Sequence, residues 1–306
     1  MDKANIMIET VDRIIWSNFG CGADEILKNE NFTNSFVYLF SVADNQYFLK
    51  LYRSKDWPED GKIPFVYRCL SQNHIPCAEL VAYSRGDDVY PNGYLIEHKV
   101  EGTSADKIHL DRGVETELYI RLAELLSRVH DINIENYGYI GSGIACYDSL
   151  IDFYDDEFDR FEDTIKDTLS DTLLKKLKEK FVGTIQAFKD LPSVLCHGDL
   201  SKKNIILKTN GEISLIDWDD ALALNWMADI SRLTFWMKQN YSEPEYALFR
   251  NTFLEHYSTP YRKDEFDVFE SAYHIYTALD FLIFAINVGD RETKNRLTIY
   301  LKKEGC

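Results

Sequence analysis

The sequence predicts an α+β fold with a small β-rich N-terminal lobe, residues 1–97, and a larger, mainly helical C-terminal lobe, residues 98–306. Three observations support this prediction. Segments rich in aromatic and β-branched residues crowd the first hundred positions. Long amphipathic segments with helical spacing follow residue 103. One hairpin signal, Asn210-Gly211 between two apolar runs, interrupts these helices.

The N-terminal lobe is expected to begin with a helix over residues 7–19, where apolar side chains recur every three or four positions. Segments 36–42 and 47–52 flank the turn signal Ala43-Asp44-Asn45-Gln46, so they predict a β-hairpin. Pro64 suits the first turn of a helix that ends near residue 73. Residues 80–83 and 94–98 are expected to add further strands.

In the C-terminal lobe, residues 115–130 form the clearest amphipathic helix. Strands 204–207 and 213–216 flank the Asn210-Gly211 turn and are the one β element expected here. Further helices are expected over residues 150–161, 173–188, 266–288 and 294–302.

The composition narrows the class of protein. Hydrophobic residues make up 45% of the 306 positions, which is enough for a real core. A formal net charge of −17 repels phosphate backbones and anionic lipids, so we expect no nucleic-acid or membrane partner. No signal peptide or spanning segment is recognised, and we expect a cytoplasmic protein. The six cysteines lack metal spacing and are expected to be buried thiols of a reducing compartment.

The motif that carries chemistry is His197-Gly198-Asp199-Leu200-Ser201-Lys202-Lys203-Asn204, which leads directly into the predicted hairpin. The far strand of the hairpin ends in Asp217. Because a hairpin brings the start of one strand beside the end of the other, Asn204 and Asp217 are expected to be neighbours, with Asp199 just before them.

Phosphoryl transfer needs such a group of side chains. One carboxylate orients the attacking hydroxyl, and two oxygen ligands hold Mg²⁺ against the nucleotide phosphates. An Asx-rich loop that only caps backbone groups is the alternative. The spacing together with the second aspartate favours the phosphoryl-transfer interpretation.

These motifs resemble the aminoglycoside phosphotransferase family of kinase-like enzymes, as does the segment Trp226-Met227-Ala228-Asp229. The resemblance implies a protein-kinase-like bilobal fold, Mg²⁺, and ATP or GTP as co-substrate. It makes Asp199 the catalytic base and Asp229 a buried structural carboxylate. Its remaining roles are metal ligands at Asn204 and Asp217, a phosphate-binding lysine at Lys50, and a base-binding hinge around Glu97 to Lys99.

Lys50 is also singled out by the strand pattern, because alternation places it between Phe48 and Tyr52 on one face. A lysine among apolar neighbours needs an anionic partner unless it reaches water. The helix glutamate that pairs with this lysine in the family has no clear counterpart near Ile63. The expected phosphate loop has no glycine, and Thr33, Asn34 and Ser35 are its candidate donors.

The acceptor is expected to be a small molecule with a hydroxyl group, foremost an aminoglycoside or another antibiotic. Acids spaced along one predicted helix suit a cationic acceptor, although a solvated helix face explains them equally well. Lys202 argues slightly against an aminoglycoside, because it would repel a cation. The candidate acceptor residues are Asp152, Asp155, Asp156, Asp159 and Lys202.

Two other functions remain open. One is a metabolic kinase for choline, a methylthio-sugar, an amino alcohol or homoserine. The other is a nucleotide-binding pseudokinase, which the intact set of Lys50, Asp199, Asn204 and Asp217 disfavours. The sequence leaves open whether the protein is a monomer or a homodimer.

Overall fold

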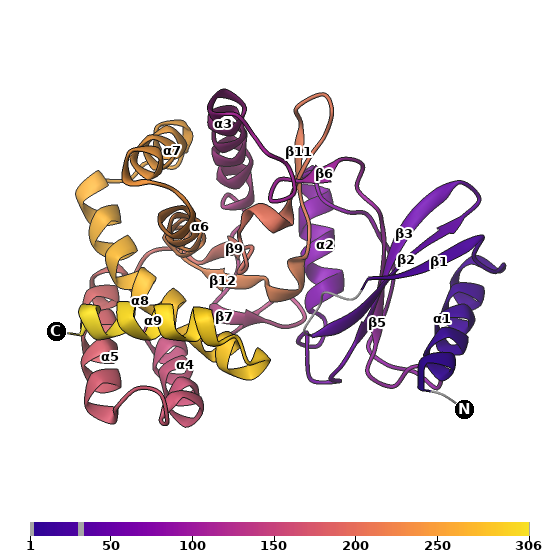
Figure 1. The fold of residues 1–306 in the computed structure, drawn as a ribbon, viewed down its shortest axis with the longest axis horizontal. Helices are drawn as coiled ribbons and strands as arrows, with labels where there is room; N and C mark the ends of the chain where they lie inside the picture. The colour runs from indigo at the N-terminus through magenta and orange to yellow at the C-terminus, as the bar shows by residue number, and fades with distance from the viewer. Residues whose placement is uncertain (1–2, 30–33, 306) are drawn as a thin grey trace. The chain divides into compact units, whose positions relative to one another are not determined.

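The computed structural model of the chain describes residues 3–29 and 34–305. The chain forms two compact units (Figure 1). Unit 1 comprises residues 1–103 and 206–219, and unit 2 comprises residues 104–205 and 220–306. The chain therefore leaves unit 1, returns to it for the segment 206–219, and leaves again. Each unit is described below by itself.

The core of unit 1 is a five-stranded sheet in the order β1-β2-β3-β5-β4. Figure 1 shows helices α1 and α2 on opposite sides of this sheet. The confirmed elements are α1 (Lys3–Phe19), β2 (Ser35–Val42), β3 (Asn45–Tyr52), α2 (Lys62–Gln72), β4 (Leu80–Ser84) and β5 (Tyr94–His98). Strand β1 (Glu25–Asn29) was not expected and pairs antiparallel with β2.

The β2–β3 hairpin explains how Lys50 is placed. The turn consists of Ala43 and Asp44, which both have positive φ, and the strands pair from Val42 and Asn45 onward. One face of β3 presents Leu49 and Leu51 to the core with α1. Since successive side chains alternate, Lys50 points to the opposite face.

Residues 98–103 and 206–219 belong to the β-rich unit, whereas the N-terminal lobe predicted from the sequence ends at residue 97. Backbone hydrogen bonds explain the difference. The N–H groups of His98 and Lys99 donate to Glu79 and Gln46, and the N–H of Leu215 donates to Pro76. These bonds attach both segments to unit 1.

The predicted hairpin forms between β10 (Ile205–Leu207) and β11 (Ile213–Leu215), which lie in a sheet of order β11-β10-β6 with β6 (Thr103–Ser104). The expectation that this hairpin is the one β element among the helices is wrong. A four-stranded sheet, β8-β7-β12-β9, lies in unit 2. Its strands are β7 (Tyr137–Ile140), β8 (Ala145–Tyr147), β9 (Val194–Cys196) and β12 (Leu222–Leu224).

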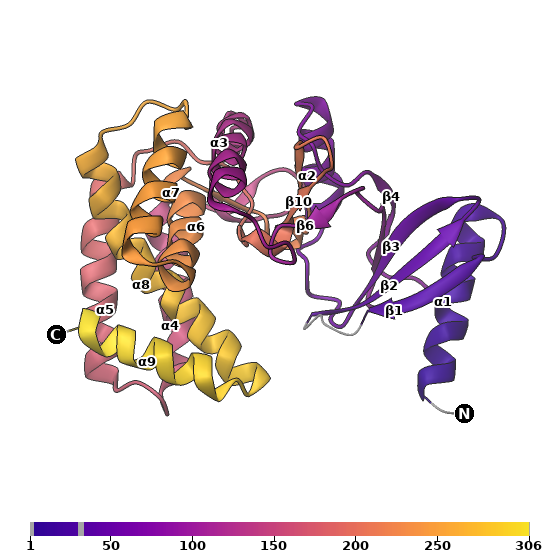
Figure 2. The same cartoon turned by 45° about the horizontal axis from the view of Figure 1, so that its top comes forward.

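Helices make up most of unit 2 (Figure 2), and all of the expected ones are present. The N-cap residues explain where several begin: Asp111, Ser149 and Ser170 accept hydrogen bonds from the first-turn N–H groups of α3, α4 and α5. The helices are α3 (Arg112–Val129), α4 (Leu150–Ile165), α5 (Asp171–Ile185), α6 (Met227–Asn240), α7 (Glu243–His256), α8 (Lys263–Val288) and α9 (Arg291–Glu304).

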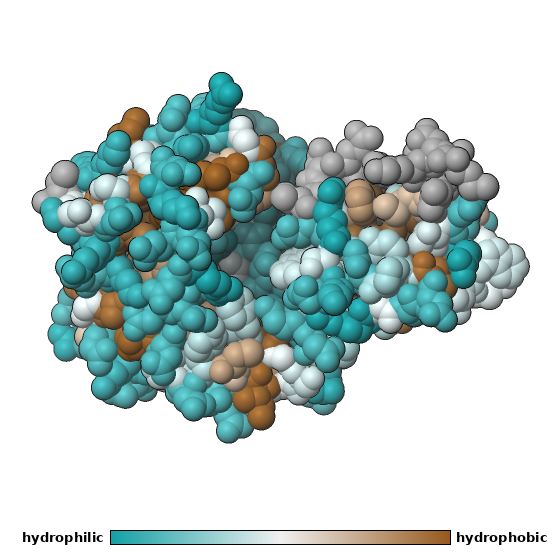
Figure 3. Space-filling view, turned by 90° about the horizontal axis from the view of Figure 1, so that it is seen from below, coloured by the Kyte–Doolittle hydropathy of each residue, from teal (hydrophilic) through white to brown (hydrophobic). Residues whose placement is uncertain are grey.

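Helix α8 is long and apolar enough to cross a membrane by length and composition, and 56% of its apolar window is buried inside the protein. Phe266, Ile275 and Leu282 on this helix have no exposed surface, as in the central helix of a core. On the face shown in Figure 3, hydrophilic residues predominate and hydrophobic residues form small separate groups.

The cysteines differ from the expectation of buried thiols. Cys21 and Cys146 are exposed, whereas Cys196 is buried. Cys69 and Cys77 are half-buried, and Cys306 lies outside the described residues. All of the described cysteines are free thiols.

Candidate active site

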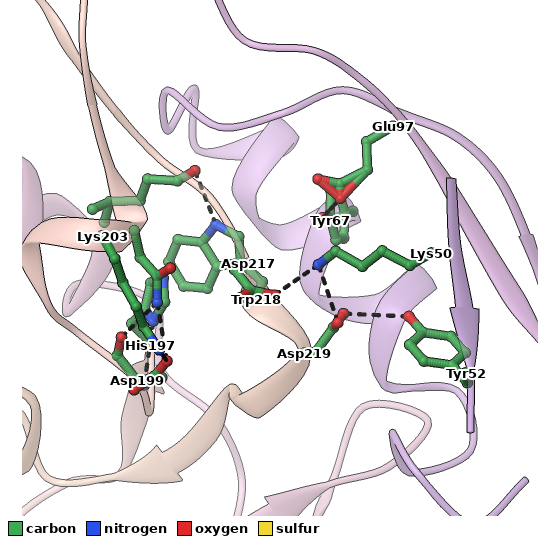
Figure 4. Close-up of polar contacts among 12 residues, drawn as sticks. Lys50, Tyr52, Tyr67, Glu97, His197, Asp199, Lys203, Asp217, Trp218 and Asp219 are labelled. Carbon is green, nitrogen blue, oxygen red and sulfur yellow. Dashed lines mark hydrogen bonds and ion pairs between the residues drawn. The ribbon is translucent and has the colours of Figure 1, made fainter. Parts of the chain in front are cut away.

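The loop that the sequence predicts to be catalytic, called the catalytic loop below, runs from His197 to Asn204 in unit 2, between β9 and β10. Its central carboxylate, Asp199, is 9% exposed. The Asn204 amide Nδ2 donates to Asp199 Oδ2 at 3.1 Å, and Lys203 Nζ lies 2.8 Å from the same oxygen. Figure 4 shows Lys203 directed at Asp199. These contacts fix Oδ2 of the carboxylate.

Asp229, on the first turn of α6, holds the beginning of the catalytic loop. Its carboxylate accepts the N–H of His197 at 2.5 Å and the N–H of Gly198 at 3.0 Å. Gly198 has φ 79°, and a Cβ there would lie 1.9 Å from the carbonyl oxygen of Asp220. Glycine is therefore the residue that this close approach requires. The structure confirms that Asp229 is buried, with 2% of its surface exposed.

His130, at the end of α3, completes this support. Its Nε2 lies 3.4 Å from Asp229 Oδ2, and its Nδ1 is 2.7 Å from the Tyr257 hydroxyl. Burial works against the charge of Asp229, but the hydrogen bond and charge of His130 lower the Asp229 pKa below its usual value. The ligand atoms of His130, Cys196 and Asp229 lie within 4.8 Å of one another, as in a metal site. Because hydrogen bonds already use the atoms of His130 and Asp229, we interpret this cluster as structural.

Arg232 faces the other oxygen of Asp199. Its guanidinium Nη2 lies 3.7 Å from Asp199 Oδ1 and 3.0 Å from Asp280 Oδ2 on α8. The guanidinium also lies 4.7 Å from the centre of the Phe281 ring. Arg232 thus brings a positive charge close to Asp199 from α6, one turn after Asp229.

In unit 1, Lys50 lies between two carboxylates (Figure 4). Its Nζ is 2.7 Å from Asp217 Oδ1 and 3.1 Å from Asp219 Oδ2. Lys50 is 7% exposed. Burial favours the neutral amine, but the two carboxylates outweigh it and raise the Lys50 pKa well above its usual value. Lys50 is therefore a charged lysine held in place by two carboxylates.

The predicted hinge lies at the end of β5. Glu97 is buried and accepts a hydrogen bond from the Tyr67 hydroxyl of α2 at 3.0 Å. Lys99 Nζ donates to Gln46 Oε1 at 2.7 Å. The N–H groups of His98 and Lys99 are already used by backbone carbonyls of unit 1. Contacts of this segment with a nucleotide base stay a prediction.

Part of the predicted phosphate loop lies outside the described residues, including Thr33. The carbonyl of Asn34 accepts the N–H of Arg53 at 3.0 Å. Ser35 is buried as the first residue of β2, opposite Tyr52. The roles of these residues toward phosphate stay predictions.

The two predicted metal ligands offer the oxygen donors that Mg²⁺ prefers. Both side-chain hydrogen bonds of Asn204 come from Nδ2, so its Oδ1 is the atom suited to a cation. Asp217 has φ 68°, a backbone conformation that non-glycine residues rarely adopt and that is often found at functional sites. Asn204 belongs to unit 2 and Asp217 to unit 1, and their proximity stays a prediction.

The candidate acceptor residues have partners of their own. Lys178 of α5 lies 3.1 Å from Asp155 and 2.9 Å from Asp159. The Tyr147 hydroxyl donates to Asp156 at 2.5 Å, and Asp152 is exposed in the first turn of α4. Lys202 Nζ lies 2.5 Å from Glu115 on α3. These contacts tie Asp155, Asp159 and Lys202 to neighbouring helices and Asp156 to β8, and their binding of an acceptor stays a prediction.

Sequence reasoning missed Asp219 and Arg232. Asp219 has a usable signal, because it stands two residues after Asp217 in an Asp-Trp-Asp segment. Arg232 follows Asp229 by three residues, so helical spacing places both on one side of α6. A partner on α8, Asp280, was not foreseeable from that spacing.

Solved structures share this fold over nearly the whole chain. A thermostable mutant of the aminoglycoside phosphotransferase APH(4)-Ia, in complex with ADP and hygromycin B, is 19% identical with a TM-score of 0.74; the match covers 97% of this chain and 98% of that one. Choline kinase LicA from Streptococcus pneumoniae is 14% identical with a TM-score of 0.67, covering 98% and 97%. The GDP and kanamycin complex of APH(2")-IIia is 13% identical with a TM-score of 0.63, covering 97% and 98%.

These likenesses confirm the protein-kinase-like α+β fold. No curated protein sequence matches the chain. The model of the phosphotransferase enzyme family matches residues 29–266, which include Lys50, Asp199, Asn204 and Asp217. The match spans well over half of the 306 residues, and the chain belongs to the phosphotransferase enzyme family.

Proposed function

We propose that this protein transfers the γ-phosphoryl group of ATP or GTP to a hydroxyl of a small molecule, foremost an aminoglycoside or another antibiotic. The observation that carries the proposal is the buried Asp199 carboxylate, whose Oδ2 is fixed by Asn204 and Lys203 and whose Oδ1 has Arg232 at 3.7 Å, beyond hydrogen-bond distance. A carboxylate held in this way is suited to accept the proton of an attacking hydroxyl.

The remaining residues take the supporting roles. Lys50 would bind the nucleotide phosphates, since its ammonium group is already charged and fixed. Asn204 and Asp217 would hold Mg²⁺, which neutralises developing charge on the phosphates when it is bound. The acceptor hydroxyl would lose its proton to Asp199 as the phosphoryl group is transferred and the nucleoside diphosphate leaves.

A metabolic kinase is the second candidate function, because the fold is also that of choline kinase LicA over 98% of this chain. Two contacts also weaken the case for a polycationic acceptor. The acids of α4 that suit a cation are partly neutralised by Lys178, and Arg232 adds a positive charge beside Asp199. We propose a cytoplasmic site of action in either case, where nucleoside triphosphates are at hand.

A panel of acceptors separates the two candidates. Release of ADP or GDP is measured with Mg²⁺ and either ATP or GTP, against aminoglycosides, choline, methylthio-sugars, amino alcohols and homoserine. The proposal predicts turnover with at least one hydroxyl compound and a phosphorylated product in the mass spectrum. Nucleotide binding without turnover on any acceptor would instead favour a pseudokinase.

A further inference from the structure

Helix α2 has no carboxylate to offer Lys50. Its sequence, Lys-Ile-Pro-Phe-Val-Tyr-Arg-Cys-Leu-Ser-Gln, contains no aspartate or glutamate. The acid-bearing position of a kinase-type lysine–glutamate pair is thus missing from this helix. The buried face of α2 carries instead a second lysine, Lys62, which is 1% exposed. A buried lysine without an anion is costly, so the charge of Lys50 needs another partner.

Asp219 meets this need within unit 1. Its Oδ2 lies 3.1 Å from Lys50 Nζ, and its Oδ1 accepts the Tyr52 hydroxyl of β3 at 3.3 Å. Lys62 Nζ donates to the Asp219 backbone carbonyl at 3.3 Å and also contacts Glu59. The side chain and main chain of Asp219 are therefore held from both β3 and α2. Figure 4 shows Lys50, Asp219 and Tyr52 in one connected line.

Asp217 does not fill the same role, although it also contacts Lys50. Its side chain is 27% exposed, whereas the side chain of Asp219 is 3% exposed. A carboxylate that binds a cation shares its charge with that cation. Asp219 is buried away from water, and its Oδ2 is directed at Lys50 Nζ.

We propose that Asp219 is the residue that positions Lys50, in place of a carboxylate on α2. The lysine is then oriented by the 3₁₀ turn Trp218–Asp220 that directly follows Asp217, so the phosphate-binding lysine and the predicted metal ligand are fixed by one short segment. The link to phosphate binding rests on the proposed function, whereas the positioning of Lys50 does not.

The first test measures two affinities by calorimetric titration in the presence of Mg²⁺. One is the affinity for the nucleoside triphosphate that the wild type binds, and the other is the affinity for the corresponding nucleoside. Asp219→Asn should lower the triphosphate affinity roughly tenfold or more, because a charge-assisted contact is lost, and leave the nucleoside affinity unchanged. A purely structural role would weaken both ligands equally. Asp220→Asn is the matched control, because Asp220 is the exposed neighbour in the same turn.

A double-mutant cycle sharpens this test. If Asp219 acts through Lys50, Asp219→Asn should cost no further triphosphate affinity once Lys50→Met is present. Tyr52→Phe removes only the hydrogen bond to Asp219 Oδ1 and should cause a smaller loss in the same direction. This variant keeps the test decisive if Asp219→Asn does not fold.

The second test needs neither nucleotide nor acceptor. Crystal structures of the nucleotide-free wild type, Asp219→Asn and Asp220→Asn show where the Lys50 side chain lies. In Asp219→Asn the Lys50 ammonium should leave its wild-type position, whereas in Asp220→Asn it should keep that position. An unchanged position of Lys50 in Asp219→Asn would overturn the positioning role. A wild type that binds no nucleotide would overturn the proposed function instead, and the position of Lys50 would still decide on Asp219.

Discussion

At the scale of single residues, two buried carboxylates hold the catalytic loop and Lys50 in place. Asp229 fixes the catalytic loop through the N–H groups of His197 and Gly198, and Asp219 fixes Lys50. Both residues are about 2% exposed, and each carboxylate accepts hydrogen bonds from more than one residue. A buried carboxylate is stable only when such partners surround it, so these residues also fix their neighbours.

The sequence predicted these residues unevenly. Asp199, Asn204 and Asp217 could be predicted because they lie within one short stretch of sequence, and their spacing around a hairpin is typical of phosphoryl transfer. Lys50 stands out through strand alternation, and β3 confirms its direction. Asp219 follows Asp217 by two residues, but its contact with Lys50 could not be predicted, because the two residues lie 169 positions apart in sequence. Arg232 is held by an ion pair with Asp280 on another helix, and no local sequence pattern indicates this contact.

Gly198 allows a residue-scale prediction. Gly198→Ala should destabilise the fold by about 3 kcal/mol or more, because the new Cβ would overlap the Asp220 carbonyl and the residue has positive φ. Thermal and denaturant unfolding measure the loss. Gly183→Ala on α5 is the control, since its Cβ would meet nothing within 4 Å, and it should stabilise by up to about 1 kcal/mol. Equal stability of the two variants would contradict the close approach.

At the scale of elements, the packing of α6 against α8 includes a buried histidine. His274 of α8 is 4% exposed, and its Nε2 is 3.2 Å from the Thr234 hydroxyl of α6. Burial lowers the pKa of His274 to about 4 from a usual value of 6.5. The folded protein thus keeps this side chain neutral between these pH values, whereas the unfolded chain binds a proton.

This difference predicts acid sensitivity. The contribution of His274 is fully present above pH 6.5 and is lost as the pH falls toward 4, by up to about 3 kcal/mol. Denaturant unfolding at several pH values should show a flatter profile for His274→Asn than for the wild type. His256→Asn is the control, because His256 is exposed at the end of α7 and should leave the profile unchanged.

The long elements were predictable and the short strands were not. The expected helices of unit 2 and the β2–β3 and β10–β11 hairpins carry periodic patterns or turn signals within one window of sequence. Strands β8, β9 and β12 have three residues each, which is too short for a period. They form because distant segments pair, as Leu222 does with Cys196 and with Tyr139.

At the scale of the whole chain, the two units are not consecutive in sequence. Residues 206–219, which include Asp217 and Asp219, belong to the β-rich unit, although they follow the catalytic loop of unit 2 in sequence. The family match at residues 29–266 includes segments of both units. The sequence predicted two lobes with one boundary, because periodic patterns are local. They do not show which distant segments pair with one another.

The most direct test of the account is the Asp199→Ala variant, measured with Mg²⁺, nucleotide and the acceptor found in the panel. Turnover should fall at least about 10²-fold, because the carboxylate proposed to accept the hydroxyl proton is removed, while nucleotide affinity stays at the wild-type value. Asp163→Ala, which removes an exposed acid of α4, should leave turnover unchanged. Full activity in Asp199→Ala would contradict the proposal that Asp199 accepts the proton of the attacking hydroxyl.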